Sequence, residues 1–235
     1  MFCAQCGEEL NPGALTCPQC GAKSGAEDPQ AVQAKLTEIQ EKALRAAKDA
    51  GHILRAVLTD PVGGLPAGFA SLGPARARRA GIVLSVAFSM ISAVGVRIAA
   101  GRLLGGLLGD AEPHGVVALL KLTVVLLVPP AALVGAMFLI RRVRGLKSEL
   151  SEEVYTTGAA VAPLAVALLL SAILGVANVE VAVVLSLLAW CYFILILYSG
   201  LTAVGGLSSK AAAPAVPLVV LVAAWLAKIC FAALM

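Results

Sequence analysis

Histidine is almost absent from this sequence of 235 residues, which contains only His52 and His114. His52 has no second metal-binding side chain at ligand spacing, so we interpret it as an ordinary residue on a helix surface. The sequence also has no glycine-rich loop that would hold a phosphate group and no serine, histidine and acid arrangement. These absences exclude the common catalytic constellations, and we expect a protein that is not an enzyme.

Charged residues are scarce as well. They make up 14% of the chain, whereas 60% of the residues are hydrophobic and the mean hydropathy is +0.92. Soluble proteins contain about 25% charged residues, so this composition predicts an integral membrane protein whose first partner is the lipid bilayer. The net charge of +4 is small, and the basic residues lie beside the apolar runs instead of forming one patch. That distribution argues against nucleic acid as a partner.

A secretory signal is also missing. The N-terminal region holds four cysteines and several acids where a basic start and an apolar run would be needed. We therefore expect the N-terminus to stay in the cytoplasm, where thiols remain reduced.

The N-terminus does contain a repeated Cys-x-x-Cys-Gly unit, at residues 3–7 and 17–21. Its thiols belong to Cys3, Cys6, Cys17 and Cys20. Two such pairs supply four thiolates on two tight turns, which is a ligand set for tetrahedral zinc. Disulfides are the alternative, and the expected cytoplasmic location argues against them. Because four thiolates leave no open coordination position, we predict that the zinc is structural.

The zinc-binding module is predicted to cover residues 1–22. So short a segment cannot bury a stable core, so metal must hold it together. Gly7 and Gly21 each follow a cysteine pair, at a place where the turn needs a positive φ. The module resembles the short zinc ribbons found at the N-terminus of many bacterial and archaeal membrane proteins.

A flexible linker at residues 23–28 precedes a predicted amphipathic helix at residues 29–58, with Asp28 as its cap and Pro29 as its first residue. The apolar positions follow alternating steps of four and three, which is a heptad seam. They are Val32, Leu36, Ile39, Ala43, Ala46, Ala50, Ile53 and Val57. The central positions of this seam are alanines, whose small side chains offer little apolar surface there. Three interpretations stay open: a solvated spacer, docking of the C-terminal end on the membrane surface or membrane domain, and self-association into a homo-oligomer.

Five long apolar runs follow a pre-membrane segment at residues 59–80. The predicted spans are residues 81–104, 116–140, 157–177, 181–200 and 213–235, each long enough to cross about 30 Å of hydrocarbon. The predicted fold is therefore an all-α polytopic membrane domain of five transmembrane helices at residues 81–235, preceded by the zinc ribbon and the amphipathic helix. Pro129 and Pro130 lie inside the second run and should kink that helix.

The loops differ in charge. With the N-terminus in the cytoplasm, the inner side carries Arg76, Arg78, Arg79, Arg141, Arg142, Arg144, Lys147 and Lys210, and the outer side carries Asp110, Glu112 and Glu180. This agrees with the positive-inside rule and predicts a cytoplasmic N-terminus and an external C-terminus. The charged island at residues 141–153 is then the main topology determinant, and docking of the ribbon on it is the alternative.

Several basic residues fall within or near the outer halves of the predicted spans. They are Arg97, Arg102, Lys121 and Lys228, with Glu180 in the turn that joins the third and fourth spans. In one interpretation their side chains reach the outer interface and pair with Glu180, Asp110 or Glu112. In the other they contact a lipid phosphate or another anionic ligand at the outer leaflet, because charges inside a membrane are costly.

Three stretches carry a resemblance to a known family. They are Val-Tyr-Thr-Thr-Gly-Ala-Ala-Val-Ala-Pro-Leu at residues 154–164, Trp-Cys-Tyr-Phe-Ile-Leu-Ile-Leu-Tyr-Ser-Gly-Leu at residues 190–201, and Leu-Ser-Ser-Lys-Ala at residues 207–211, with Asp60, Pro61 and Phe69 ahead of the first span. Residues 59–235 thus look similar to the Yip1 family of five-span membrane proteins. The resemblance implies a five-helix bundle with a cytoplasmic N-terminal region. The ribbon and the bias toward alanine, glycine, valine and arginine indicate a prokaryotic member in the cytoplasmic membrane.

These features predict a non-enzymatic membrane adaptor or organiser, whose cytoplasmic zinc ribbon recruits a protein partner. The alternative is a small transporter or lipid-handling protein that uses the kinked second span and the basic residues of the outer half.

Overall fold

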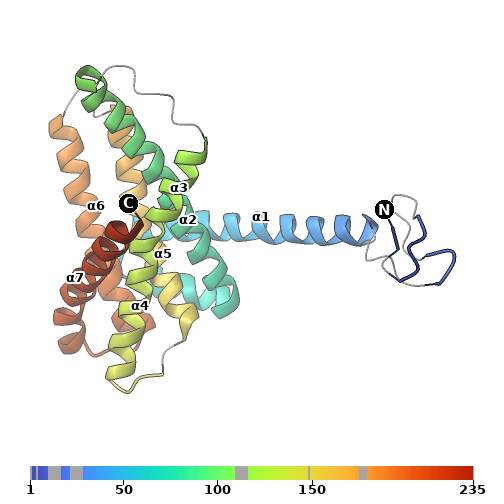
Figure 1. Ribbon diagram of the computed structural model, residues 1–235. Helices are drawn as coiled ribbons and strands as arrows, with labels where there is room; N and C mark the ends of the chain where they lie inside the picture. The colour runs from blue at the N-terminus through green and yellow to red at the C-terminus, as the bar shows by residue number, and fades with distance from the viewer. Residues whose placement is uncertain are drawn as a thin grey trace. The chain divides into compact units, whose positions relative to one another are not determined.

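The computed structural model describes residues 2–3, 5–9, 17–21, 29–108, 116–147, 149–174 and 179–234 (Figure 1). Its helices are α1 (Pro29–Thr59), α2 (Gly64–Leu108), α3 (Val116–Leu126), α4 (Val128–Val143), α5 (Leu150–Leu174), α6 (Val179–Ser199), the short π-helix η1 (Gly200–Val204) and α7 (Ser209–Leu234). The chain forms two compact units, Met1–Arg45 and Ala46–Met235. The second unit contains all the long apolar helices.

The described residues contain five helices that are long and apolar enough to cross a membrane. The apolar stretches are Gly64–Ile98, Leu119–Val143, Leu150–Ser171, Glu180–Val204 and Ser209–Cys230. The predicted number of spans is therefore confirmed. The first one differs at its start, because α2 already begins at Gly64 and runs through most of the predicted pre-membrane segment. Its one break is at Gly73, whose φ of 70° separates a short helix from the long one that Pro74 begins.

The predicted kink in the second span lies between α3 and α4. The helix is interrupted at Leu127, directly before Val128, Pro129 and Pro130. Pro130 has no N–H to donate to the carbonyl of Leu126, four residues earlier. The hydroxyl of Ser89 on α2 lies 3.0 Å from that carbonyl oxygen and can donate to it in place of the missing N–H. The kink is thus matched by a polar contact from the neighbouring helix, as an apolar environment requires.

The core of the second unit is built on a close crossing of α2 and α5. A Cβ on Gly81 would lie 2.4 Å from the carbonyl oxygen of Val154, and a Cβ on Gly158 would lie 2.3 Å from the carbonyl oxygen of Gly81. Only glycine allows the two backbones to approach so closely. Tyr155, fully buried beside this crossing, contacts the ring of Phe69 at a centroid distance of 5.3 Å.

Replacing Gly158 by alanine is expected to push α5 away from α2 and to destabilise the protein by about 1–3 kcal/mol, because the new methyl group meets backbone atoms that cannot rotate aside. Gly135 on α4 is the matched control, since nothing lies within 4 Å of a Cβ built there. Gly135→Ala should be neutral or stabilising by up to about 1 kcal/mol. Thermal unfolding of both variants in one detergent checks the difference. Equal melting temperatures would contradict the close crossing.

The end of α1 is docked on the helices of the second unit. Ala50, Ile53 and Val57 are buried in the same apolar core as α2, α5 and α6. Arg76 of α2 forms a two-point ion pair with Asp49, with nitrogen–oxygen distances of 2.7 and 3.1 Å. Of the three interpretations of this helix, docking of its C-terminal end on the membrane domain therefore holds.

Three hydroxyl groups from later helices form hydrogen bonds with backbone carbonyls around the junction of α1 and α2. Tyr155 donates to the carbonyl of Leu65 at 2.9 Å, and Ser199 donates to the carbonyl of Val62 at 2.6 Å. The hydroxyl of Tyr192 reaches the carbonyl of Leu58 at 3.3 Å. The carbonyls of Leu58, in the last turn of α1, and of Val62, between the two helices, have no partner within a helix, so Tyr192 and Ser199 satisfy groups that would otherwise be unpaired. Leu65 lies in the first turn of α2, and the contact of Tyr155 joins that turn to α5.

Candidate metal centre

Each Cys-x-x-Cys-Gly unit folds as the same tight turn. The N–H of Gly7 donates to the carbonyl of Cys3 at 2.9 Å, and the N–H of Gly21 donates to the carbonyl of Cys17 at 2.9 Å. The two glycines have φ values of 74° and 70°, so the predicted positive φ is confirmed at both. A residue with a Cβ would be strained in this conformation. The short motif thus fixes the position of its two sulfur atoms locally.

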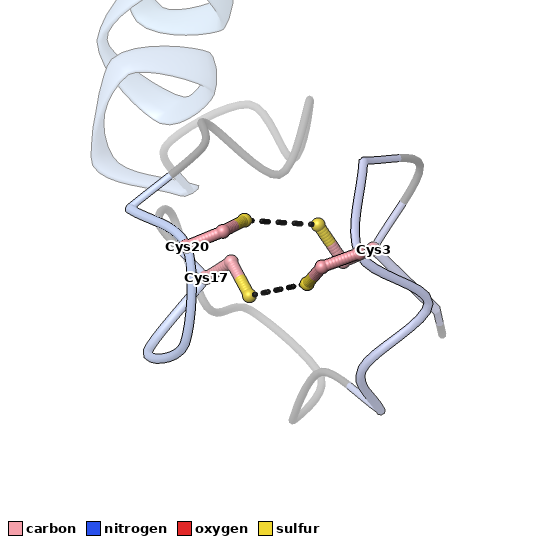
Figure 2. Close-up of side chains that lie close together, drawn as sticks. Cys3, Cys17 and Cys20 are labelled. Carbon is pink, nitrogen blue, oxygen red and sulfur yellow. Dashed lines mark hydrogen bonds between the residues drawn. The ribbon is translucent and has the colours of Figure 1, made fainter.

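The two turns bring all four sulfur atoms together (Figure 2). The Sγ atoms of Cys3 and Cys20 lie 3.6 Å apart, those of Cys6 and Cys17 lie 3.5 Å apart, and every pair of the four is within 4.8 Å. Zinc–sulfur bonds of about 2.3 Å in a tetrahedron place sulfur atoms about 3.8 Å apart. A disulfide would need about 2.05 Å, and none of the four cysteines forms one. The donor set therefore fits zinc.

Backbone N–H groups of each turn point at the first sulfur of its pair. Those of Gln5 and Cys6 lower the pKa of Cys3 from 9.0 to about 6. The N–H of Cys20, with that of a neighbouring residue, lowers the pKa of Cys17 in the same way. Hydrogen bonds to a thiolate favour the charged form, so these turns favour the ionised sulfur that binds metal.

The second sulfur of the first pair shows why a cation is needed. The N–H of Glu8 favours its thiolate, but the neighbouring sulfur atoms of Cys17 and Cys20 outweigh this effect and raise the pKa of Cys6 to about 12. Four negative sulfur atoms this close repel one another unless a positive ion lies between them. A tetrahedral zinc ion supplies that charge and uses all four ligands, so its role is structural.

The basic residues predicted for the outer half lie on three helices. Arg97 is half-buried on α2, and Lys121 on α3 and Lys228 on α7 are exposed. The side chains of these three residues form no ion pair or hydrogen bond within the described parts of the chain. Glu180 is exposed in the first turn of α6. The side chain of Arg102, and Asp110 and Glu112, lie outside what the structure describes. Contact of this group with a lipid or anion stays a prediction.

A buried ion cluster lies where the sequence indicated only a topology signal. Within the charged island, Arg142 and Arg144 are exposed, whereas the side chain of Arg141 is 4% exposed. Its Nη1 lies 2.5 Å from a carboxylate oxygen of Glu152 and 2.6 Å from one of Glu153. These contacts join the end of α4 to the start of α5.

Two further segments of the chain lie close to this guanidinium group. Its Nη2 donates to the carbonyl of Lys147 at 2.8 Å, inside the loop that joins the two helices. A Cβ on Gly205, directly after η1, would lie 3.3 Å from the Nε atom of Arg141. The sequence signal for this cluster is an arginine before a short loop, with two glutamates just after it. Opposite charges on the two sides of one short loop are within reach of each other, so this pattern indicates an ion pair across the loop.

Comparison with known proteins supports the metal centre. Residues 2–24 match the zinc-ribbon domain family. No curated protein and no solved structure matches the chain. The family match is confined to the N-terminal module, so the resemblance of residues 59–235 to the Yip1 family stays a prediction. The chain thus combines an N-terminal zinc ribbon, which binds structural zinc through four cysteines, with five helices of the kind that cross a membrane.

Proposed function

We propose that this protein is a non-enzymatic membrane adaptor, in which the zinc ribbon binds a cytoplasmic protein partner and the five apolar helices hold it at the membrane. The observation that carries the proposal is the metal centre, where four thiols converge on one metal position. Zinc held by four thiolates has no free position for a substrate or water. Its contribution is to keep a small surface folded, and a stable small surface serves binding.

The ribbon offers a side chain suited to such binding. Phe2 exposes 72% of its surface and lies opposite Glu9 in a short antiparallel bridge. Gln5, Glu8 and Glu9 are also exposed around the first turn. An exposed aromatic ring with polar neighbours is typical of the residues that dominate binding energy at protein interfaces. We infer that Phe2 is a central contact for the partner.

The location follows from the same proposal. The basic residues beside the apolar helices support a cytoplasmic ribbon, and the composition supports a prokaryotic cytoplasmic membrane. The Yip1-like residues support assignment of the five helices to that type of bundle. In this arrangement the C-terminal end of α1 belongs to the membrane unit, because its buried side and the Asp49–Arg76 ion pair lie within that unit.

Crosslinking and affinity capture of the full-length protein test the adaptor function. A partner captured by the intact chain is expected to be lost when residues 1–22 are removed and to be reduced by Phe2→Ser, while the five helices still insert. Arg142→Gln is the matched control, because Arg142 is exposed and lies outside the ribbon. Capture that is unchanged without the ribbon would contradict the proposal. Loss of function only on replacing Lys121 or Lys228 would favour transport or lipid handling instead.

A further inference from the structure

The helices α4 and α7 leave an apolar groove between them. It has a volume of about 370 Å³ and is lined by residues of these two helices and by Arg144, which directly follows α4. Small residues such as Ala136 and Ala215 form its buried floor, and Val143 and Leu218 are exposed at its rim. This shape suits a narrow apolar chain that lies along the helices.

The groove has one polar end. α4 finishes at the end of the groove where α7 begins, because a Cβ on Gly205, just before α7, would lie 3.3 Å from the Nε atom of Arg141, near the end of α4. Arg144 and Ala211 are the lining residues nearest that end along the two segments. Among the residues that the structure describes, Arg144 is the only charged one that lines the groove. At 1.5 Å per residue, the lining positions span roughly 12–16 Å along each helix. One leaflet of a bilayer contributes about half of 30 Å of hydrocarbon, so the groove has the length of one leaflet.

Further positive charge lies near this end. Lys210 is exposed and directly precedes Ala211, which lines the groove. Arg142 is exposed, and its guanidinium group lies 5.8 Å from the centre of the Phe138 ring. The nearby carboxylates of Glu152 and Glu153 are engaged by Arg141, and no acidic residue lines the groove. The apolar stretches of the two spans end at Val143 and begin at Ser209, so these cations lie at the ends of the apolar stretches.

We propose that this groove binds an anionic phospholipid of the adjacent leaflet, with one acyl chain between α4 and α7 and the phosphate group at Arg144 and Lys210. Basic pockets between transmembrane helices are suited to anionic headgroups, and each basic residue near a membrane surface contributes measurably to that attraction. The site is distinct from the predicted basic residues Arg97, Lys121 and Lys228, and it does not depend on the zinc ribbon.

Native mass spectrometry of the full-length protein tests the site, with phosphatidylglycerol and phosphatidylcholine of the same acyl chains as probes. Phosphatidylglycerol is expected to be retained preferentially, and Arg144→Gln should lower its retention about fivefold. Arg79→Gln is the matched control, because Arg79 is an exposed arginine of α2 that does not line the groove. Equal retention of the two lipids, or equal losses in both variants, would overturn the proposal.

A second measurement needs only the unchanged protein. Phosphatidylglycerol with a photoreactive group in its acyl chain should crosslink to peptides of α4 and α7, and excess phosphatidylglycerol should compete. Inorganic phosphate and glycerol phosphate should not compete, because they lack the chain that fills the groove. Crosslinks spread evenly over all five apolar helices would show ordinary surrounding lipid and would overturn the site. Competition by inorganic phosphate would reassign it to a soluble anion.

Discussion

Replacing Cys17 by serine in the full-length protein is expected to abolish the binding of zinc and to unfold the ribbon. The sulfur of Cys17 lies 3.5 Å from that of Cys6 within a set of four, and its side chain is buried. Metal binding supplies the folding energy of such small modules, on the order of 10 kcal/mol. Zinc content by elemental analysis should fall from one ion per chain to none. Chelation of the wild-type protein, or acidification that protonates the thiolates, should have the same effect.

Cys191→Ser provides the control for that experiment. Cys191 is an exposed cysteine of α6 and is not part of the four-sulfur set. Its zinc content should equal that of the wild type. The thiols at positions 3, 6 and 20 should react with a maleimide only in the Cys17→Ser protein or after chelation. Because the membrane unit has its own core, its thermal unfolding should not change. Retention of a full zinc ion by Cys17→Ser would show that the centre has been assigned wrongly.

Arg141→Met is expected to destabilise the membrane unit by about 3–5 kcal/mol. The change removes the guanidinium group whose Nη1 lies 2.5 Å from Glu152 and 2.6 Å from Glu153, and the side chain of Glu153 is 3% exposed. A buried carboxylate that loses its partner cannot regain water, which makes breaking such a pair costly. Thermal or denaturant unfolding in detergent, followed by helix content, measures the effect. The same measurement on Arg142→Met should show a loss of no more than about 1 kcal/mol.

A triple variant separates the loss of the ion pair from the loss of packing. If unpaired charge is the cause, combining Arg141→Met with Glu152→Gln and Glu153→Gln should recover much of the stability, because replacing a whole buried ion cluster is often close to neutral. If the triple variant is as unstable as Arg141→Met, the arginine acts through its shape and its contact with the Lys147 carbonyl. Equal stability of Arg141→Met and the wild type would contradict the buried cluster itself.

Local features of this protein could be predicted from its sequence. The zinc ligands lie within two five-residue motifs whose turns are set by Gly7 and Gly21. The apolar runs are long enough that their length alone indicates spanning helices. The break beside Pro129 and Pro130 follows from the missing N–H groups. Each of these features depends on residues close together in the chain, so no knowledge of the tertiary structure was needed.

Features that depend on distant residues could not be predicted in the same way. Gly81 and Gly158 are two of many glycines in the sequence, and only the crossing of α2 with α5 gives them their role. The junction of α1 and α2 accepts hydrogen bonds from Tyr155, Tyr192 and Ser199, which lie on helices much later in the chain. The apolar groove is defined by α4 and α7 together. Helix packing in a membrane uses small residues and isolated polar contacts, which leave little periodic pattern to detect.

The hydroxyl contacts at the end of α1 set an order of events during synthesis. Chains are made from the N-terminus, and N-terminal units fold first. The ribbon can bind zinc as soon as Cys20 has left the ribosome. The backbone around the junction of α1 and α2, however, accepts hydrogen bonds from Tyr155, Tyr192 and Ser199. In a nascent chain, the ion pair of Asp49 with Arg76 can therefore form once α2 has been made, whereas the contacts of Tyr192 and Ser199 form only after the fourth apolar helix has been made.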